Sequence, residues 1–391
     1  MFTKILIANR GEIANRIKKT ADDLNIQAVF FESQNPRDYY DASKIIDFAL
    51  QNGVDAIHPG YGFLSENAEF VQLVESAGLK FIGPHSSFIE LFGNKANSRQ
   101  MTLRRNVKTI PEPVKDEYPR VIKFNDGAGG RGTQVIDEPL DNLVAGTFYY
   151  EKFLPRIRHI EAQVFSDGKI IHILGYRDGS IQLRQQKMIE MTAVVSGIVE
   201  SQILEAIQQM SDEFNGYVGV ATIEFVLDLD SNNVYFMEVN PRIQVEHAVT
   251  ELTSSIDIVE LQLKLADGQS ISIEPSNQGF AIEARILAID SETKLPNAGL
   301  IEDVVLPTTV RIDNGFLSPN TEVSPFFDPL LAKFISYGLN FEQTRQKLVS
   351  ALEETKITGI KTNVDLLKKI LTSEDFMNDK LDTNFLTDHF G

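Results

Sequence analysis

The order of apolar and polar positions along the chain predicts two kinds of architecture. The sequence begins with KILIAN, a short apolar run typical of a buried strand, and QAVFFE, DAIHP and KFIGP are further short strands. Amphipathic helices are predicted between them over residues 11–25, 41–53 and 69–78. Strands that alternate with helices in this way are typical of a parallel sheet covered by helices. We therefore predict a small parallel α/β layer at the start of the chain.

The rest of the chain predicts antiparallel pairing. Residues 109–149 contain two strands, VIKF and TQVID, on either side of a glycine-rich loop, and this segment is small for an independent core, so we interpret it as a flap or lid. Within residues 150–391, EAQVFS and KIIHILG are joined at Asp167-Gly168, SIQLR follows, and VATIEFVLD and NVYFMEV are joined at residues 229–233. The predicted regions are 1–108 with its linker, the lid 109–149, and a larger C-terminal region 150–391.

An acidic hairpin is the first candidate for chemistry. If its turn is centred near Ser231, Glu224 and Glu238 lie opposite each other, with Cβ atoms about 5 Å apart. Two like charges at that distance destabilise a sheet unless a cation lies between them, and Mg²⁺ prefers oxygen ligands and shares its shell with nucleotide phosphates. A register shifted by one residue would instead turn one carboxylate to solvent. The hairpin therefore predicts either a metal site or a solvated pair.

A stripe of polar residues continues the hairpin. It consists of Glu238, Asn240, Arg242, Gln244 and Glu246. The positions between them are apolar, so an extended chain would place all five side chains on one face. A solvated strand face would show the same alternation. However, Asn is uncommon in strands, and an Arg beside two carboxylates favours a binding site that holds metal ligands, an anion-binding cation and a base.

The glycine-rich loop is a candidate for phosphate binding. Gly127, Gly129 and Gly132 match the spacing G-x-G-x-x-G, but the residues on both sides favour strands, whereas a dinucleotide-binding loop opens a helix. The loop therefore either closes over phosphates through its backbone N–H groups or is an ordinary glycine-rich hairpin. Lys123, in the apolar strand before the loop, favours the first interpretation, because an inward-facing Lys needs an anionic partner.

Composition narrows the classes of function. The 391 residues are 42% hydrophobic, which is enough for more than one packed unit, and the formal net charge of −18 disfavours nucleic acid as a partner. The absence of cysteine excludes disulfides, zinc–thiolate sites and thiol nucleophiles, and it fits a reducing compartment. We see no apolar run long enough for a signal-peptide core or a membrane span, so we expect a cytoplasmic protein without a membrane partner.

A series of motifs resembles the biotin carboxylases of the ATP-grasp superfamily, in the same order and over nearly the whole chain. They are ANRGEIA (8–14), HPGYGFLSEN (58–67), FIGP (81–84), the GAGGRG loop, RHIEAQV (158–164), EVNPRIQVEH (238–247), EARI (283–286) and GIKTNVDL (359–366). The resemblance implies an ATP-grasp fold, α/β and α+β in class. It has an N-terminal parallel α/β domain, a small mobile lid and a C-terminal antiparallel-sheet domain.

The same resemblance implies roles for particular residues. ATP phosphates would be bound by Lys95, Lys123 and the loop glycines Gly127, Gly129, Gly130 and Gly132, and the rest of the nucleotide by Glu151, Lys152, Leu154 and Gln182. Mg²⁺ or Mn²⁺ would be held by Glu224, Glu238 and Asn240. Bicarbonate would be held by Arg242, Gln244 and the Val245 backbone, approached by Lys187 and deprotonated by Glu246. Biotin would be bound by Tyr61 and by Arg285, which stabilises its enolate.

The resemblance thus implies ATP- and bicarbonate-dependent carboxylation of biotin through carboxyphosphate. This is the first half-reaction of a biotin-dependent carboxylase, and we expect an acyl-CoA carboxylase such as the acetyl-CoA carboxylase of fatty acid biosynthesis. Because no AMKM-like biotin-attachment sequence occurs, we expect a separate biotin carrier protein and a separate carboxyltransferase, and the family suggests a homodimer.

Two alternatives remain. One is another ATP-grasp ligase that passes an acyl phosphate to an amine, which Tyr61 and Arg285 disfavour. The other is a catalytically weakened paralogue that acts as a binding or regulatory subunit.

The chain also departs from the family pattern. It is shorter than a usual member, with apparent deletions after Glu32, around residues 108–118 and after Ile136. Gln185 stands where the family has a His that contacts the nucleotide, and MTAVV replaces an acidic, proline-containing run. We therefore predict weaker nucleotide binding than in a full-length relative.

Overall fold

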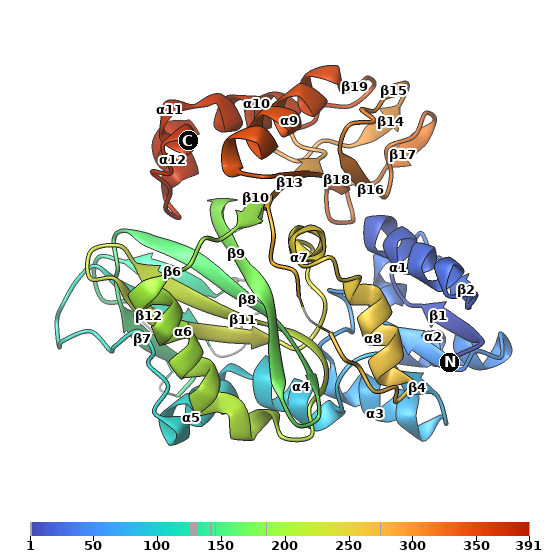
Figure 1. Cartoon of the computed structure of the whole chain (residues 1–391), viewed down its shortest axis with the longest axis horizontal. Coiled ribbons are helices and arrows are strands. Elements are labelled where there is room, and N and C mark those ends of the chain that lie inside the picture. The colour runs from blue at the N-terminus through green and yellow to red at the C-terminus, as the bar shows by residue number, and fades with distance from the viewer. Residues whose placement is uncertain are drawn as a thin grey trace.

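The structure is a computed structural model that describes residues 2–390 except 125–131, 141–142, 145, 185 and 274, and except the side chains of residues 95 and 96. Figure 1 shows the N-terminal layer (blue) on the right, the C-terminal elements (orange and red) at the top, and the lid strands with the central sheet on the left. In the described part of the chain, no helix has both the length and the apolar character that a membrane span requires.

The N-terminal segment forms the predicted parallel layer, with strand order β2-β1-β3-β4. Successive residues of β1 point to opposite faces, and both faces are covered: Leu6 packs with the helices of this layer, and Ile5 and Ile7 pack towards the large sheet. The elements are β1 (Lys4–Ile7), α1 (Gly11–Asp23), β2 (Gln27–Phe30), η1 (Pro36–Tyr40), α2 (Ala42–Gln51), β3 (Ala56–His58), α3 (Ala68–Ser76) and β4 (Lys80–Phe81).

The lid is a three-stranded antiparallel sheet with the order β6-β5-β7. It follows α4 (Ser86–Gly93) and α5 (Lys95–Arg105). The strands predicted from VIKF and TQVID are β5 (Arg120–Phe124) and β6 (Thr133–Ile136), and β7 (Phe148–Lys152) pairs with the other edge of β5. The boundary predicted after residue 149 cuts through β7, because FYYEK continues as a strand paired to β5 as far as Lys152.

An eight-stranded antiparallel sheet forms the centre of the molecule, with the order β12-β11-β8-β9-β10-β13-β18-β16. Both predicted hairpins are confirmed. KIIHILG and SIQLR, predicted as separate strands, belong to one long strand, because a register shift after Gln163, opposite Gly175, bends the β8/β9 pair without ending it. The elements are β8 (Ile157–Asp167), β9 (Ile171–Leu183), β10 (Gln186–Thr192), α6 (Gly197–Met210), η2 (Ser211–Phe214), β11 (Val218–Asp228), β12 (Asn233–Asn240), α7 (His247–Ser254) and α8 (Ile258–Ala266).

The C-terminal elements extend this sheet and cover its end with helices. Their apolar residues form one core with those of β10 and β13. The elements are β13 (Phe280–Leu287), β14 (Gly299–Ile301), β15 (Val304–Val305), β16 (Arg311–Asn314), β17 (Thr321–Val323), β18 (Leu330–Gly338), α9 (Phe341–Glu354), β19 (Lys356–Ile357), α10 (Val364–Thr372), α11 (Glu374–Met377) and α12 (Phe385–Phe390).

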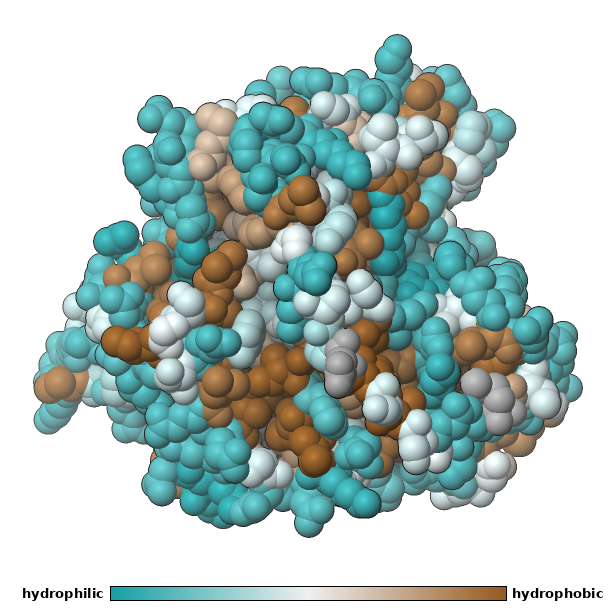
Figure 2. All heavy atoms as spheres, in the orientation of Figure 1, coloured by the Kyte–Doolittle hydropathy of each residue, from teal (hydrophilic) through white to brown (hydrophobic). Residues whose placement is uncertain are grey.

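The N-terminal layer and the large sheet share a core. Ile5 and Ile13 of the first layer pack in one cluster with Phe165 of β8, Val220 of β11 and Ile258 of α8. The visible face in Figure 2 is mostly hydrophilic, with hydrophobic groups gathered between α6 and α8. Side chains from the N-terminal layer, the large sheet and the C-terminal strands are therefore held in one packed body around the site.

Candidate active site

The acidic hairpin has the predicted register. Glu224 of β11 pairs directly with Glu238 of β12, and a register shift follows Glu224. The Asn240 amide Nδ2 donates to Glu224 Oε1 at 2.8 Å and to Glu238 Oε1 at 3.4 Å. The three predicted metal ligands therefore lie together on one face of the sheet.

The polar stripe does not continue as a strand, which corrects the prediction. The strand β12 ends at Asn240 and residues 241–246 form a loop, because Pro241 has no N–H to donate to the ladder. The loop nevertheless turns back to the same site: the Gln244 amide donates to Glu224 Oε1 at 2.6 Å. Arg242 lies to the side, with Nε 3.2 Å from Glu66 Oε2 and Nη2 donating to Asn240 Oδ1 at 3.0 Å.

Lys187 is the central cation of the site. Its Nζ donates to Glu246 Oε1 at 2.7 Å, contacts the Glu161 carboxylate and lies 3.8 Å from Glu224 Oε1. Burial opposes a charge on this amine, but the three carboxylates outweigh burial and raise the pKa of Lys187. Lys187 is therefore a fixed positive charge between the acidic hairpin and the residue predicted to be the base.

Two cations hold Glu246. Besides Lys187, Arg285 of β13 donates from Nη2 to Glu246 Oε2 at 3.2 Å and also contacts Glu190. Burial alone would raise the pKa of Glu246, but Lys187 and Arg285 together lower it well below its usual range. The predicted base and the predicted biotin residue Arg285 are thus in direct contact, and Glu246 is ionised.

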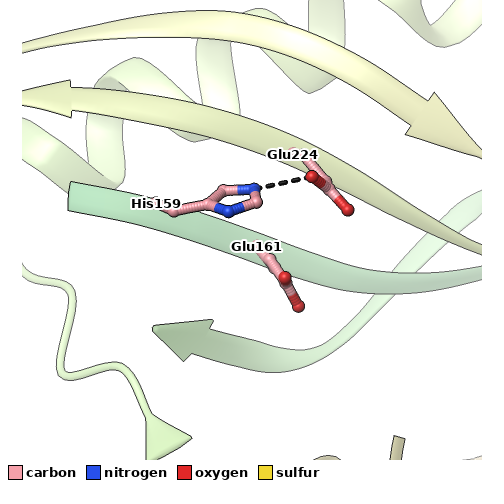
Figure 3. A group of neighbouring side chains, drawn as sticks. All are labelled: His159, Glu161 and Glu224. Atoms are coloured by element: carbon pink, nitrogen blue, oxygen red, sulfur yellow. Dashed lines mark hydrogen bonds and ion pairs between the residues drawn. The ribbon is translucent and has the colours of Figure 1, made fainter. Parts of the chain in front are cut away.

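Strand β8 contributes two site residues that the sequence analysis missed. His159 Nε2 lies 2.6 Å from Glu224 Oε2, and ligand atoms of His159, Glu161 and Glu224 all lie within 4.8 Å of one another (Figure 3). Both β8 side chains are buried. The signal was available in RHIEAQV, where His159, Glu161 and Gln163 alternate with apolar residues, as in the acidic stripe.

A buried arginine on β9, also missed, connects these strands. Arg177 is fully buried, and its guanidinium makes five hydrogen bonds of 2.7–3.3 Å. The acceptors are Glu161, Gln163, Thr222, Gln244 and Thr250. Because one acceptor is Gln244, Arg177 fixes the loop 241–246 to the sheet.

The hairpin fits a divalent cation. His159 and Lys187 outweigh the burial of Glu224 and hold its pKa at about 2, so this carboxylate is ionised. Burial and the neighbouring charge of Glu224 raise the pKa of Glu238. Glu224 and Glu238 are thus two buried carboxylates that repel each other, and the cations nearby do not lower the pKa of Glu238. Such a pair is suited to Mg²⁺, whose charge would offset the repulsion between them.

The predicted nucleotide residues lie on the lid and at its junction with the large sheet. The anionic partner that Lys123 needs is Glu151 on the neighbouring strand, with Nζ 2.7 Å from Oε2. Lys152 Nζ lies 3.5 Å from Glu117 Oε1, Leu154 is half-buried, and Gln182 pairs with Lys187 across β9 and β10. Gly127, Gly129, Gly130, Gln185 and the Lys95 side chain lie outside the described residues.

Two further predicted residues are described. Gly132 has a φ of +95°, and its carbonyl accepts a hydrogen bond from the Phe124 N–H at 2.8 Å, which closes the base of the loop. Tyr61 lies in the turn after β3, and its hydroxyl contacts the Glu12 carboxylate.

A large antiparallel sheet that carries clustered carboxylates, a lysine and arginines, with a small antiparallel lid, defines the ATP-grasp class. Family models match successive segments of the chain. They are the biotin carboxylase N-terminal domain (residues 1–38 and 31–89), the ATP binding domain of the carbamoyl-phosphate synthase L chain (98–274) and the biotin carboxylase C-terminal domain (283–388). The chain is also 36% identical to the biotin carboxylase of Halalkalibacterium halodurans, covering 100% of this chain and 98% of the relative. The chain belongs to the biotin carboxylase family.

Solved structures agree over the whole chain. The biotin carboxylase–beta-gamma-ATP complex from Campylobacter jejuni has a TM-score of 0.92 at 32% identity, covering 100% of this chain and 99% of that one. The biotin carboxylase domain dimer of Hydrogenobacter thermophilus 2-oxoglutarate carboxylase, in complex with MgADP, ADP and bicarbonate, has a TM-score of 0.91 at 34% identity, covering 100% and 98%. The alignment with the H. halodurans protein spans 447 positions, more than this chain's 391 residues, so that relative has segments that this chain lacks.

Proposed function

We propose that this protein uses ATP and bicarbonate to carboxylate biotin carried on a second protein. The observation that carries the proposal is the convergence of the acidic hairpin with Lys187, Glu246 and Arg285. The residues that we assign as metal ligands, phosphate-directed cation, base and enolate-directed cation lie within one continuous network of contacts. This is the set of groups that two successive reactions on bicarbonate and biotin need.

The first step is attack of bicarbonate on the γ-phosphate of ATP. Gln244 and Arg242 would orient bicarbonate, Glu246 would take its proton, and Lys187 would face the negative charge on the phosphoryl group. A bicarbonate–phosphorus bond forms, the bond to ADP breaks, and the product is carboxyphosphate. Phosphoryl transfer depends mainly on positioning and charge neutralisation. Mg²⁺ bound by Glu224, Glu238 and Asn240 would supply part of that neutralisation.

The contacts of Glu246 imply how this base becomes active. The Glu246 carboxylate is a weak base while it contacts two cations, because Lys187 and Arg285 lower its pKa. Both cations are also the groups assigned to substrate anions, Lys187 to the phosphate and Arg285 to the biotin enolate. Substrates that attract these side chains away from Glu246 would therefore raise its pKa towards the range that a general base needs.

The second step transfers the carboxyl group to biotin. Carboxyphosphate breaks down to CO₂ and phosphate, phosphate takes the ureido proton of biotin, and the resulting enolate attacks CO₂ through nitrogen. Arg285 would stabilise the enolate oxygen, and Tyr61 would form a wall of the biotin pocket. Closure of the lid would exclude water, which would otherwise compete for CO₂ and carboxyphosphate.

The wider assignment has five parts. We propose that biotin is borne on a separate carrier and that a separate carboxyltransferase passes the carboxyl group on. The Hydrogenobacter relative, described as a dimer, supports a homodimer. The acceptor would be an acyl-CoA, as in acetyl-CoA carboxylase, although the similar protein of 2-oxoglutarate carboxylase serves a different acceptor. The absence of cysteine supports a cytoplasmic location.

A bicarbonate-dependent ATPase assay tests the proposal. ADP release should require both Mg²⁺ and bicarbonate, and free biotin should increase it. A matched control is Glu353→Gln, on the exposed side of α9, which should behave like the wild-type protein. Tight MgATP binding without bicarbonate-dependent ADP release would instead identify a regulatory paralogue and refute the catalytic proposal.

A further inference from the structure

A second buried cluster of charged residues contacts the loop of residues 241–246, to which we assign bicarbonate binding. Its centre is Lys333 of β18, whose side chain is fully buried. Carboxylates approach Lys333 Nζ from three elements: Glu12 of α1 at 3.2 Å, Asp313 of β16 at 3.6 Å and Glu283 of β13 at 4.0 Å. One lysine therefore joins the N-terminal layer to the C-terminal strands.

Lys333 also reaches the loop that carries the proposed bicarbonate residues. Its Nζ donates to the Val245 carbonyl at 2.5 Å. Val245 lies between Gln244 and Glu246, so this hydrogen bond fixes the backbone of the loop, whereas Arg177 holds the Gln244 side chain. Lys333 and Arg177 thus anchor two successive residues of the loop.

The same lysine is linked to the proposed biotin pocket. Glu12, 3% exposed, faces Lys333 with Oε2, and its Oε1 accepts a hydrogen bond from the Tyr61 hydroxyl. A continuous path therefore runs from the Val245 carbonyl through Lys333 and Glu12 to Tyr61. It connects the loop assigned to bicarbonate with the wall assigned to biotin.

Burying a lysine costs free energy even when acids surround it, and an apolar side chain of similar length would fill the same space at less cost. The hydrogen bond to a particular backbone carbonyl is a contact that no apolar side chain can make. We infer that Lys333 is a positioning residue that holds residues 244–246 in register with Tyr61, so that the bicarbonate and biotin sites form together. The inference rests on the proposed function for its kinetic readout.

The kinetic test compares Lys333→Met with the control Lys347→Met. Lys347 is an exposed lysine on α9 that also reaches a backbone carbonyl, that of Tyr337. A displacement of about 1 Å in a catalytic group can cost on the order of 10²-fold in rate. For Lys333→Met we expect the KM for bicarbonate to rise at least about tenfold. The dissociation constant of MgATP should be unchanged, because Lys333 contacts Glu12, Glu283, Asp313 and Val245, none of which is a predicted nucleotide residue. Lys347→Met should match the wild type.

Hydrogen exchange of the backbone amides in residues 241–250 gives a readout that does not depend on activity. Lys333→Met should speed exchange there and leave residues 218–228 protected. This separates the inference from the proposed function: a wild-type protein without bicarbonate-dependent ATPase refutes the function, whereas unchanged exchange in the loop refutes the role of Lys333. An equal loss of MgATP and bicarbonate affinity would assign Lys333 to folding and also overturn the inference.

Lys333→Arg serves if Lys333→Met does not fold, because it keeps the charge that Glu12 and Asp313 require. The larger guanidinium cannot donate to Val245 from the same point without moving the loop. We expect a smaller rise in the KM for bicarbonate in the same direction, with MgATP binding retained. An unchanged KM in this variant, together with an unfolded Lys333→Met, would restrict Lys333 to folding and refute the inference.

Discussion

The lid sheet and the large sheet differ in how firmly they hold their parts of the proposed site. The lid carries predicted nucleotide residues, and the large sheet carries the proposed metal ligands and base. In the large sheet, Arg177 is fully buried with five hydrogen bonds, and each carboxylate around Lys187 touches more than one partner. In the lid, β5 is paired on both edges, but the described residues of 109–152 contain no helix to cover it. Within the described lid residues, ion pairs join Lys123 to Glu151 and Lys152 to Glu117.

The comparison indicates which of the proposed steps require side chains that are held rigidly. Groups that face developing charge must be held before the substrate arrives, and the large sheet does this with buried, saturated contacts. The lid has only to cover the nucleotide and exclude water. We therefore expect the apparent deletions in the lid to affect nucleotide affinity more than the chemical steps.

The largest expected effect comes from the large sheet. Glu246→Gln should reduce bicarbonate-dependent ATP cleavage by about 10²–10⁴-fold, because a positioned base is lost. MgATP binding should stay nearly the same, since Glu246 lies beyond the metal ligands. Steady-state ADP release and equilibrium nucleotide binding measure the two quantities. Near-normal turnover in this variant would contradict the assignment of the base.

The two sheets should also differ in stability. Ile223 of β11 and Ile122 of β5 are both fully buried. Ile223→Ala should lower the free energy of unfolding by about 2–5 kcal/mol, because it leaves a cavity in the core that the large sheet forms with α4, α5 and α6. Ile122→Ala should leave the main transition within about 1 kcal/mol and speed hydrogen exchange only in the lid. Urea unfolding and hydrogen exchange would show this, and equal effects on the main transition would mean that the lid is part of the cooperative core.

We expect the N-terminal layer to unfold together with the large sheet. The pH dependence of the free energy of unfolding tests this. His58 is fully buried, and burial lowers its pKa from 6.5 to about 3. The unfolded chain therefore binds a proton before the folded one does. As a result, the free energy of unfolding should fall as the pH decreases from about 6.5, by about 2 kcal/mol at pH 5.

A variant isolates this contribution. His58→Asn should flatten the pH dependence of the free energy of unfolding in that range. The matched control is His85→Asn, which changes an exposed histidine. A pH dependence equal in His58→Asn and in the wild type would show that His58 is not held neutral by the fold.

The smallest expected effect concerns the nucleotide. The resemblance implies a nucleotide-contacting His at position 185, where this chain has Gln, so we expect Gln185→His to tighten MgATP binding. One regained hydrogen bond corresponds to roughly 0.5–1.5 kcal/mol, or about 2–10-fold in the dissociation constant. Isothermal titration calorimetry of both proteins measures it. A weaker or unchanged affinity would argue that the shorter lid alone determines nucleotide binding.

The fold and the acidic hairpin could be predicted from local patterns. A turn near Ser231 predicted the pairing of Glu224 with Glu238, and the structure reaches this pairing through a register shift after Glu224, because the register at the turn, with Asp228 opposite Asn233, would place Met237 there. The path beyond Asn240 could not be predicted by alternation, because the ladder stops at Pro241 and contacts with Arg177 and Lys333 set the loop instead. Those partners come from β9 and β18, far away in the sequence.

The sequence analysis failed mainly to predict charged residues that are buried in apolar strands. His159 and Glu161 alternate with apolar residues as the acidic stripe does, so the same test would have found them. Lys333 in LLAKFIS has apolar residues, Leu331 and Ile335, at the alternate positions, and its role depends on acids brought in from α1, β13 and β16. No local pattern indicates such a residue.

The most direct test of the account follows labelled bicarbonate into biotin, with the wild type and Arg285→Ala assayed together. The wild type should form labelled carboxybiotin in step with ADP. Arg285→Ala should lose label transfer much more than ADP release, because we propose that Arg285 stabilises only the later enolate. ADP release by the wild type without label in biotin, or equal loss of both products in Arg285→Ala, would contradict the account.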